Sequence, residues 1–512
     1  MAIACADVLI VGAGAAGLTL AIELARRGVA FRLVDKLNEP FRGSRGKGIQ
    51  PRSQEIFEDL GILDRVVAAG GVYPPQREYR DDGTCQESLI MESRGPTPDE
   101  PYHIPLLVPQ FLTETVMRER LAELGSRPEF GVELISFEQD PEGVTADLSG
   151  PAGVERLRVR YLVGTDGGRS FVRQKLEIDF PGKTLGVRAV VADVLCTGVS
   201  RDAWHRFNEG SMENQLSLCP LPGTDLFQLQ APIPLEGDID LSASGLTAMI
   251  AQRIRRAEIT VQSVAWASAF NMNARLAERY QQGRVFLAGD AAHVHPPTGG
   301  QGLNTSLQDT YNLGWKLAAV LRGAPEALLA TYEEERRPIA AQMLGLATSL
   351  LEAVKRGSMR CGREVHQLDI GYAGFSLALE APARQVGILA GDRAPDAPLR
   401  GAGGQPRRLF DLFAGPHWTL LGYQPAHPIR VPAREGLRIH IVGPNGELQD
   451  TSGHLQAAYG VAAGDWVLVR PDSYIGAIVS SSELPCLEQY LDRVGVVGGG
   501  WGPVCRAVIP AL

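Results

Sequence analysis

The sequence contains no long uninterrupted apolar segment. No stretch approaches the ~18 apolar residues that cross a bilayer, and the N-terminal apolar run, Val8–Val11, is too short for the core of a secretory signal. We therefore expect neither a membrane-embedded nor a secreted protein, and the predicted location is cytoplasmic. With 512 residues, of which 44% are hydrophobic, the chain is long enough to bury two or three cores.

Cysteine is scarce and scattered. The seven cysteines form no C-x-x-C pair and no Cys/His spacing typical of a metal site. They are expected to be reduced thiols, so neither a disulfide framework nor thiol redox chemistry is predicted. His293 and His295 are separated by one residue and have no further ligands nearby in the sequence. No metal site is predicted.

The sequence also lacks a basic stripe. It has 50 Lys and Arg residues against 59 Asp and Glu residues, which gives a net charge of −9. This balance disfavours nucleic acid or an anionic membrane as the main partner. A small molecule is the expected partner, and the protein is expected to be a monomer or a homodimer.

Glycine is placed where it has chemical meaning. A short apolar strand, Val8–Val11, leads directly into a G-x-G-x-x-G motif at Gly12, Gly14 and Gly17, and an amphipathic helix pattern follows over Leu18–Arg27. In this context Gly12 permits a tight turn and Gly14 lets a pyrophosphate approach the backbone. Gly17 lets the helix pack on the strand.

A second strand strengthens this interpretation. The apolar pattern over Ala30–Val34 ends at Asp35, about 20 residues after the first glycine, where an acidic ribose ligand is expected. The sequence therefore predicts a βαβ unit that binds an adenine dinucleotide. The residues predicted to form this site are Gly12, Gly14, Ala15, Ala16, Gly17, Asp35 and Lys36.

Two later segments repeat the order of strand and glycine turn. Tyr161–Gly164 is apolar and runs into a turn with Asp166 and Gly167, and Val285–Ala288 runs into Gly289 and Asp290. The second of these turns is followed by a helix start that contains Gly299, Gly300 and Gly302. Glycines at a helix start leave the backbone N–H groups open to an anion or to a flat ring.

Together these three motifs resemble those of the class A flavoprotein monooxygenases, the family of p-hydroxybenzoate, phenol and aromatic polyketide hydroxylases. The resemblance covers residues 1 to about 345. It implies that the first motif binds the ADP half of FAD and that Asp166 and Gly167 serve both FAD and the nicotinamide donor. It also implies that Gly289 and Asp290 hold the ribityl chain.

The resemblance extends to further residues. It implies that Arg45 lies beside the flavin diphosphate and guides flavin motion, and that Gln110 touches the cofactor. A solvated basic loop and a polar helix start are the alternative interpretations of these two residues. Pro297, Gly299, Gly302, Leu303 and Asn304 are predicted to line the flavin site. For catalysis, the N–H groups of the Gly302 helix start are predicted to hold charge on the reduced flavin, and Pro297 to rigidify the approach and line the pocket.

The activity implied by the resemblance is hydroxylation of an aromatic substrate, phenolic or polycyclic and polyketide-like, by O₂ through a flavin C4a-hydroperoxide. No second G-x-G-x-x-G lies in a βαβ context, so NAD(P)H, with NADPH favoured, is expected to bind transiently. Baeyer–Villiger insertion and antibiotic inactivation remain open. A halogenase is disfavoured because the sequence has no W-x-W, and a non-catalytic flavoprotein is the alternative of a different class.

The expected fold is α/β, with a discontinuous Rossmann-like FAD-binding domain, an inserted antiparallel substrate sheet and a thioredoxin-like C-terminal domain. The first part of the FAD domain is expected over residues 1–176, with 74–100 contributing to the substrate domain. The substrate domain is expected over 177–279, the second part of the FAD domain over 280–390, and the C-terminal domain over 391–512. Because C-x-x-C is absent, a structural or oligomeric role is expected for the last domain.

Alternating polar and apolar residues predict the individual elements. Strands of the inserted sheet are predicted over Gly186–Leu195, Asn214–Leu221, Asp225–Ile233 and Ile259–Phe270. Helices are predicted over Asn304–Arg322, around Tyr332–Pro338, and in a further segment through Leu351. After a linker at Gly391–Asp396, strands are predicted over Trp418–Tyr423, Ile439–Val442 and Trp466–Arg470. The candidates for the substrate wall are His205, Phe207, Phe227, Gln228 and Met272, with a sheet core as the alternative for the apolar ones.

Overall fold

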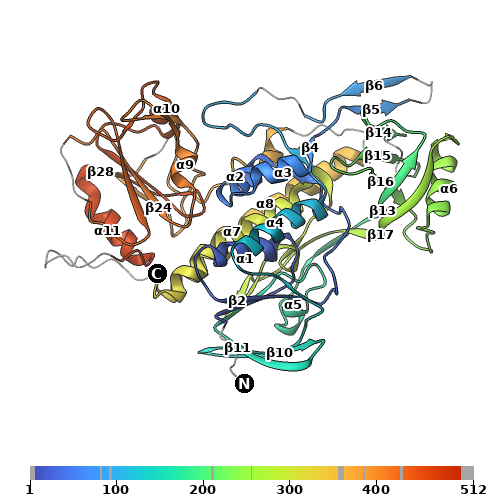
Figure 1. The fold of residues 1–512 in the computed structure, drawn as a ribbon, viewed down its shortest axis with the longest axis horizontal. Coiled ribbons are helices and arrows are strands. Elements are labelled where there is room, and N and C mark those ends of the chain that lie inside the picture. The colour runs from blue at the N-terminus through green and yellow to red at the C-terminus, as the bar shows by residue number, and fades with distance from the viewer. Residues whose placement is uncertain are drawn as a thin grey trace.

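A computed structural model describes residues 6–80, 84–91, 95–208, 211, 213–254, 256–355, 362–384, 387–426 and 431–497. A group of helices forms its centre, with a large sheet on one side and the C-terminal sheet on the other (Figure 1). The large sheet is antiparallel, as predicted, except for one parallel pair of strands. None of the helices in these residues combines the length and the apolar character needed to span a bilayer.

The three sequence motifs meet at one sheet. Its six strands lie in the order β18-β19-β12-β1-β2-β8, and the four inner strands run parallel. They are β1 (Val8–Val11), β2 (Phe31–Asp35), β12 (Tyr161–Gly164) and β19 (Val285–Leu287), flanked by β18 (Gln281–Gln282) and β8 (Glu129–Phe130). Since parallel strands end at the same edge, the turns after β1, β12 and β19 lie next to one another. This arrangement agrees with the predicted Rossmann-like sheet built from distant segments.

Helices pack around this sheet. Helix α1 (Ala15–Ala25) follows β1 directly, and α7 (Gln301–Leu321) follows the third glycine turn. Further helices are α2 (Pro51–Asp59), α3 (Leu63–Ala69), α4 (Gln110–Glu123), α5 (Phe171–Lys175) and α8 (Ala330–Lys355). The sequence predicted two helical segments where α8 is one continuous helix with Pro338 inside it. Burial of the neighbouring Glu335 and Arg336 among partners on other elements holds this helix through the proline.

A large sheet of eight strands lies beside the helices. Its order is β20-β17-β13-β16-β15-β14-β5-β6. The four predicted strands appear in it as β13 (Gly182–Thr197), β15 (Leu216–Pro220), β16 (Phe227–Ile233) and β17 (Thr260–Leu276). Segment 74–100 contributes β5 (Gln76–Tyr79) and β6 (Cys85–Ser88), while β14 (Trp204–Phe207) and β20 (His293–Val294) were not predicted. Helix α6 (Ala243–Ile254) covers one face with Leu246 and Ile250.

Two small sheets complete this part of the chain. One consists of β9 (Glu133–Asp140), β10 (Gly143–Gly150) and β11 (Gly153–Val159), and the other of β3 (Gly48–Ile49), β7 (Leu106–Leu107) and β4 (Gly71–Val72). Neither sheet was predicted from the sequence.

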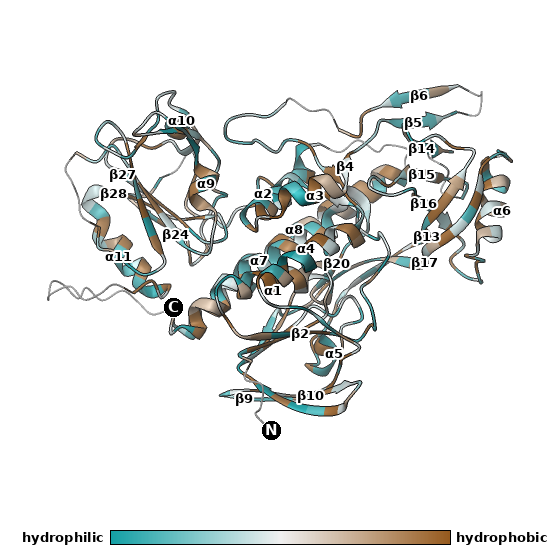
Figure 2. Cartoon of the chain, in the orientation of Figure 1, coloured by the Kyte–Doolittle hydropathy of each residue, from teal (hydrophilic) through white to brown (hydrophobic). Residues whose placement is uncertain are grey.

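The C-terminal region forms a mixed sheet in the order β21-β28-β27-β24-β25-β26-β22-β23. Its strands are β21 (Leu379–Ala381), β22 (Pro398–Gly401), β23 (Pro406–Arg408), β24 (Trp418–Tyr423), β25 (Leu437–Val442), β26 (Leu448–Gln449), β27 (Asp465–Val469) and β28 (Ile475–Ser480). Helices α9 (Leu409–Phe413), α10 (His454–Tyr459) and α11 (Leu484–Arg493) accompany them. All six residues of β24 are buried, and apolar residues, brown in Figure 2, run through these strands.

Two features differ from the predicted start of the C-terminal domain at residue 391. Strand β21 pairs with β28, so the chain joins the sheet before residue 391. The segment Gly391–Asp396, predicted as a linker, is packed: Arg393 is buried and its guanidinium lies 2.9 Å from Glu55 of α2. Asp396 accepts hydrogen bonds from Arg408 and from Phe410 N, so the charged side chains of this segment have partners within the protein, which composition alone did not reveal.

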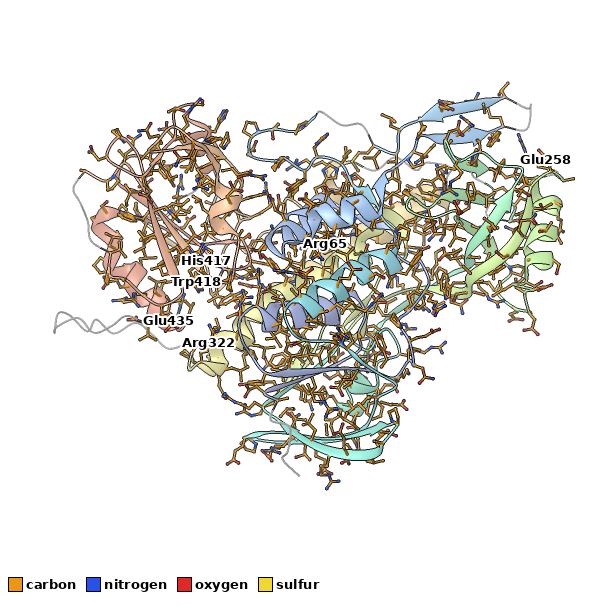
Figure 3. All side chains as sticks on the ribbon, in the orientation of Figure 1. Arg65, Glu258, Arg322, His417, Trp418 and Glu435 are labelled. Carbon is orange, nitrogen blue, oxygen red and sulfur yellow. The ribbon has the colours of Figure 1, made fainter. Side chains whose placement is uncertain are left out.

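Aromatic rings join the C-terminal sheet to the central helices. Trp418 lies on the side of the sheet that faces the helices (Figure 3), and its ring is 5.4 Å from that of Trp315 on α7 in an edge-to-face arrangement. Such pairs contribute about 0.5–1.5 kcal/mol beyond their area of burial. The C-terminal sheet is therefore packed on the helices rather than tethered beside them.

Candidate active site

A cavity of about 2000 Å³ runs from the turn after β1 to the large sheet. Sites for one drug-sized ligand usually measure about 300–1,000 Å³. The space is therefore large enough for a dinucleotide together with a second molecule. Its walls come from the three glycine turns, the loop that carries Arg45, the start of α7, and strands β13 to β17 of the large sheet.

The first glycine motif divides into two structural roles. A Cβ at Gly17 would lie 1.9 Å from the carbonyl oxygen of Gly12, and Gly12 itself has φ +108° with the chain of Thr165 against it. These two glycines are required by contacts within the protein. A Cβ at Gly14 would meet only Glu114 Oε1, at 3.8 Å, so this glycine opens the cavity instead.

Asp35 stabilises the glycine turn as well as lining the cavity. Its Oδ2 accepts a 2.8 Å hydrogen bond from Ala13 N, and its Oδ1 accepts one from Leu37 N. Ala15, Ala16 and Lys36 line the same end of the cavity. The carboxylate is thus fixed beside the turn, with lone pairs left for a polyol.

Glu114 is a residue of this site that the sequence analysis missed. Its Oε1 accepts hydrogen bonds from Ala15 N at the start of α1, at 3.2 Å, and from Gln110 Nε2, at 2.8 Å. Burial raises the pKa of Glu114 to about 7, although Gln110 and Arg118 act in the opposite direction. A titratable carboxyl group therefore lies at the helix start that the motif offers to an anion. The P-Q-x-x-x-E spacing of Gln110 and Glu114 on one helix face was the available signal.

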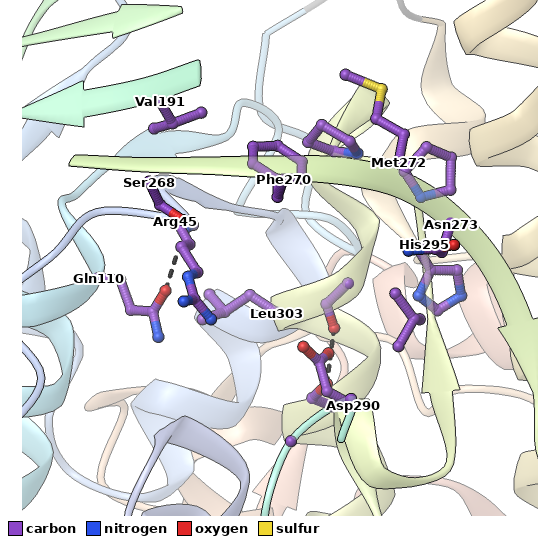
Figure 4. A pocket seen from close by; sticks show the side chains of 18 of the residues that line it. Arg45, Gln110, Val191, Ser268, Phe270, Met272, Asn273, Asp290, His295 and Leu303 are labelled. Carbon is purple, nitrogen blue, oxygen red and sulfur yellow. Dashed lines mark hydrogen bonds between the residues drawn. The ribbon is translucent and has the colours of Figure 1, made fainter. Parts of the chain in front are cut away.

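The middle of the cavity brings together four predicted residues from distant segments. Figure 4 shows Arg45 extending between Gln110 and Leu303, with Asp290 on the far side. The Arg45 guanidinium lies 5.2 Å and 5.7 Å from the ring centres of Phe41 and Trp266. Gln110 Oε1 accepts a hydrogen bond from Gly46 N, so the loop that carries Arg45 is joined to α4.

Asp290 opens onto the cavity while protein surrounds it on its other sides. This partial enclosure raises the pKa of its carboxyl group, and the nearby His293 and Arg45 lower it. Gly289 does not line the cavity, but its positive φ of 61° turns the chain, and its N–H donates to Asp309. The Gly-Asp pair therefore divides into a turn residue and a cavity residue.

The Asp-Gly turn after β12 also lies at the cavity. Asp166 Oδ2 accepts a hydrogen bond from Val172 N, and burial raises the pKa of this carboxyl group. Gly167 has φ +82°, and no atom lies within 4 Å of where its Cβ would be. Both residues line the cavity, as the sequence interpretation requires.

The start of α7 has the open geometry that its glycines predicted. Gly299 and Gly300 have φ of +74° and +64°, and a Cβ at Gly302 would meet only His295 Nδ1, at 3.9 Å. Pro297 and Leu303 line the cavity as well. A flat ligand can therefore approach the backbone of this helix start.

Asn304 departs from the predicted arrangement. Its side chain is fully buried and faces away from the cavity. Its Oδ1 accepts from Gln50 N at 2.9 Å, and its Nδ2 donates to the carbonyl oxygens of Gly48 and Gly300. Asn304 therefore fixes the loop before α2 against α7, because that loop has backbone groups that need partners.

The two histidines form no metal site. His293 Nε2 lies 2.7 Å from Asp309, whose other oxygen pairs with Arg336, and all three side chains are fully buried. His295 lines the cavity, and burial together with His293 lowers its pKa to about 3, so its ring is neutral near pH 7. Among the described residues, no group of three or more His, Cys, Asp or Glu side chains has the geometry of a metal site.

The large sheet faces the cavity with a row of side chains that the sequence analysis did not identify. Five residues are neighbours in register across five strands, from β14 through β15, β16 and β13 to β17: Arg206, Ser217, Gln230, Val191 and Ser268. All five line the cavity. Cross-strand neighbours point to the same face, so this wall is mostly polar.

The adjacent row faces the loop that carries Arg45, which corrects one predicted wall residue. Gln228 and Asp193 are register neighbours, and both bind Ser44 of that loop. Of the five wall candidates only Met272 lines the cavity. The rings of Phe207 and Phe227 belong to the sheet core, as the alternative interpretation expected, and His205 hydrogen-bonds Tyr79 and Ser200. Without strand register, the sequence could not separate these faces.

With this geometry in view, comparison with known proteins identifies the family. The family model described as FAD binding domain matches residues 5–347. The chain belongs to this FAD-binding family. A flavin-dependent monooxygenase of Mycobacteroides abscessus is 41% identical over 493 residues, which cover 95% of this chain and 99% of that protein.

Two further relatives agree. The 6-methylpretetramide 4-monooxygenase of Streptomyces rimosus is 32% identical over 513 residues, covering 92% of this chain and 90% of the relative. The structure of aklavinone-11 hydroxylase, solved with FAD and aklavinone, superposes with a TM-score of 0.81 at 27% identity, covering 96% of this chain and 98% of the other. These findings confirm the predicted resemblance: the protein is an FAD-dependent monooxygenase that uses NAD(P)H as co-substrate.

Proposed function

We propose that this enzyme hydroxylates a flat aromatic substrate, phenolic or polycyclic and polyketide-like, that lies between the start of α7 and the polar wall of the large sheet. The observation that carries the proposal is the continuity of the cavity. One space extends from Gly14, past Arg45 and Leu303, to Gln230 and the rest of that wall. A cofactor and a substrate can therefore meet in one space within the protein.

The residues around the cavity fit FAD, and we assign its parts to them. The adenosine diphosphate would be held by the turn of Gly12 and Gly14, with Ala15 and Ala16 at the helix start and Gly17 supporting it. Asp35 and Lys36 would hold the ribose side, and Arg45 and Gln110 the diphosphate. Asp166, Gly167 and Asp290, with Gly289 as the turn, would hold the ribityl region. Pro297, Gly299, Gly302 and Leu303 would border the flavin ring.

When bound, FAD accepts a hydride from NAD(P)H and activates O₂, and the protein supplies positioning and electrostatics. The N–H groups at the start of α7 would hold negative charge on the ring, an effect of about 0.3–2 kcal/mol for one helix terminus. Arg45 provides a positive charge nearby, and the neutral ring of His295 adds none. No second dinucleotide motif is present in the sequence, so the nicotinamide donor, with NADPH favoured, binds transiently.

The test is a substrate screen that follows NADPH oxidation and product formation, with polycyclic phenols and quinones first. We expect one atom of labelled O₂ in the product, as a new ring hydroxyl group. A lactone would establish Baeyer–Villiger insertion instead. A halide requirement would establish halogenation, and oxidation without incorporation of label would contradict the proposal.

For the C-terminal region we propose a thioredoxin-like fold with a structural role. Its mixed sheet with flanking helices supports this fold, and its buried contacts with α7 and α8 support the role. Cys486 is the one cysteine among the described residues of this region, whereas thioredoxin chemistry needs a pair. A Cys486→Ser variant with unchanged turnover and unchanged thermal unfolding would agree; loss of turnover would point to thiol chemistry.

A further inference from the structure

Ser44, which precedes Arg45, is the most constrained residue of the loop that carries Arg45. Its N–H donates a 2.7 Å hydrogen bond to Asp193 Oδ2, and its hydroxyl group donates to Asp193 Oδ1. Both residues are fully buried. The loop is therefore attached to strand β13 of the large sheet at the position next to Arg45.

A second residue of the sheet completes this attachment. Gln228 Nε2 donates to the Ser44 hydroxyl oxygen at 2.8 Å and to the Ser44 carbonyl oxygen. Gln228 Oε1 accepts a 2.7 Å hydrogen bond from Gln230 Nε2. Gln230 lies in the row that faces the cavity, whereas Gln228, two residues earlier on the same face of β16, is fully buried against the loop. A continuous chain of hydrogen bonds thus runs from the cavity wall to the residue before Arg45.

The direction of each hydrogen bond in this chain is fixed by chemistry. The Ser44 carbonyl oxygen can only accept, so the atom of Gln228 that contacts it must be a donor. The Gln228 amide nitrogen therefore faces Ser44, and its oxygen must accept from Gln230. One N–H of Gln230 is committed in this way. The other N–H and Oε1 remain for a molecule in the cavity.

We propose that Gln230 binds an acceptor oxygen of the substrate, such as a quinone carbonyl or a phenolate, and that Gln228 and Ser44 transmit this contact to the loop that carries Arg45. Gln228 and Asp193 are positioning residues, since neither lines the cavity. The inference rests on the proposed function in placing substrate at the sheet wall and FAD beside Arg45. Substrate and FAD should then strengthen each other's binding, because both favour one arrangement of the loop.

This coupling can be measured by binding alone. The dissociation constant of FAD is determined by titration of the apoprotein, with and without saturating 1,8-dihydroxyanthraquinone as the probe. Their ratio is the coupling factor, and by thermodynamic reciprocity FAD must change the affinity for the probe by the same factor. For the wild type we expect a factor of about fivefold or more, at the lower end of typical allosteric couplings.

Two variants break the chain at different points. Gln228→Met removes all three of its side-chain hydrogen bonds and preserves length. It should reduce the coupling factor to below about twofold and leave probe affinity without FAD within about twofold. Gln230→Met should reduce the coupling to the same extent and also weaken the probe. Because the links act in series, the double variant should lose no more coupling than either single variant.

Ser217→Ala is the matched control, since Ser217 neighbours Gln230 in the same row and does not bind the loop. It is expected to change probe affinity and retain the coupling factor. If Gln228→Met does not fold, Gln230→Met still decides the question. A coupling factor that is retained in the Gln230 variant, or lost equally in Ser217→Ala, would overturn the proposal.

Failure of this inference is distinguishable from failure of the proposed function. Oxygen incorporation into a hydroxylated product together with unaltered coupling in the glutamine variants would leave the proposed aromatic hydroxylation standing and remove the link. If the variants show the expected loss of coupling but no oxygenated product forms, the link between Gln230 and the loop would stand and the proposed hydroxylation would not. A wild-type protein that does not bind the probe would overturn the assignment of Gln230 to an acceptor oxygen.

Discussion

Charged side chains in two regions of the molecule differ in whether the protein itself supplies their partners. At the junction with the C-terminal sheet, Glu335 accepts hydrogen bonds from Asn312, Lys316 and both terminal nitrogens of Arg470, at 2.6–2.9 Å. Asp472 completes the cluster, and all of these side chains are buried. In the cavity, by contrast, Arg45 and Asp290 come from distant segments and face open space.

Charged groups at the junction are paired within the protein, whereas those in the cavity are paired fully only when a ligand is bound. Although burial alone would raise the pKa of Glu335, Arg470 and Lys316 lower it to about 2, so this carboxylate is matched within the protein. In the cavity, enclosure outweighs the neighbouring charges and raises the pKa of Asp290. Buried charge at the junction serves docking, whereas the charges of the cavity are arranged for a ligand that supplies the missing contacts.

The largest effect is expected at the junction. Glu335→Gln should destabilise the protein by about 3–5 kcal/mol, because Lys316 stays buried without its ion-pair partner and Arg470 keeps only Asp472. The free energy of unfolding is measured by denaturant titration of the FAD-bound protein. Glu352→Gln is the control: its pair with Lys355 is largely exposed, and such pairs contribute about 0–1 kcal/mol. Similar losses in both variants would contradict the comparison.

A substitution in the cavity should weaken FAD binding and leave the stability of the fold nearly unchanged. Gly14→Val places its side chain in space that the protein leaves open, so FAD affinity should fall at least about 100-fold, or ~2.7 kcal/mol. Unfolding of the apoprotein should be nearly unchanged. Gly345→Val is the control, since no atom lies near its Cβ and it is remote from the cavity lining. Equal FAD affinity of both variants would remove Gly14 from the cofactor site.

The same contrast explains what the sequence could predict. The glycine motifs, the strands before them and the Asp residues after them are local patterns, and the structure brings Gly14, Asp166, Asp290 and Gly302 to one cavity as their spacing implied. The motif chemistry constrains consecutive residues, so no knowledge of long-range contacts was needed. This is why the cofactor side of the site was the predictable side.

The substrate side depends on register between strands, which the sequence does not specify. Gln228 and Gln230 differ in role because one row of the sheet faces the loop that carries Arg45 and the next faces the cavity. Strand β14 was missed because its four residues are too few for an alternation pattern. Asn304 was assigned to the cofactor from its place in a motif, although its side chain serves the neighbouring loop.

Titration offers a way to sharpen the comparison. The pKa of Glu114 is raised to about 7, so in the folded apoprotein this carboxyl group is mostly protonated below pH 7. Its contribution to stability is therefore present below about pH 4.5 and is lost as the pH rises through 7. For Glu335 the sign is opposite, because its pKa is lowered to about 2 and its contribution is lost only as the pH falls from 4.5 toward 2.

Glu114→Gln should remove the first of these dependences. Between pH 5 and pH 8, the stability of the wild-type apoprotein relative to this variant should fall by about 1–3 kcal/mol, since each unit of pKa shift corresponds to ~1.4 kcal/mol. Denaturant unfolding of both apoproteins across this range is the measurement. Parallel stability curves would show that the carboxyl group is ionised throughout and that burial does not control it.

The smallest effect, and the most specific for catalysis, is expected at the start of α7. A Cβ at Gly302 meets only His295 at 3.9 Å, so Gly302→Val is expected to fold and to project into the space assigned to the flavin ring. It should displace the ring from the N–H groups, which contribute about 0.3–2 kcal/mol at a helix terminus. Coupling of NADPH oxidation to hydroxylation should therefore decline before FAD binding is lost.

The measurement is hydrogen peroxide released per NADPH consumed, which should rise about two- to tenfold in the Gly302 variant, with the flavin still fully reducible. Gly345→Val again serves as the control for a valine placed in a helix. If peroxide release is unchanged while FAD stays bound, the start of α7 holds the cofactor without tuning it, and the electrostatic contribution must come from Arg45 and its loop. If instead FAD is lost, Gly302 behaves like Gly14, and the two ends of the cavity are alike in requiring open backbone for binding alone.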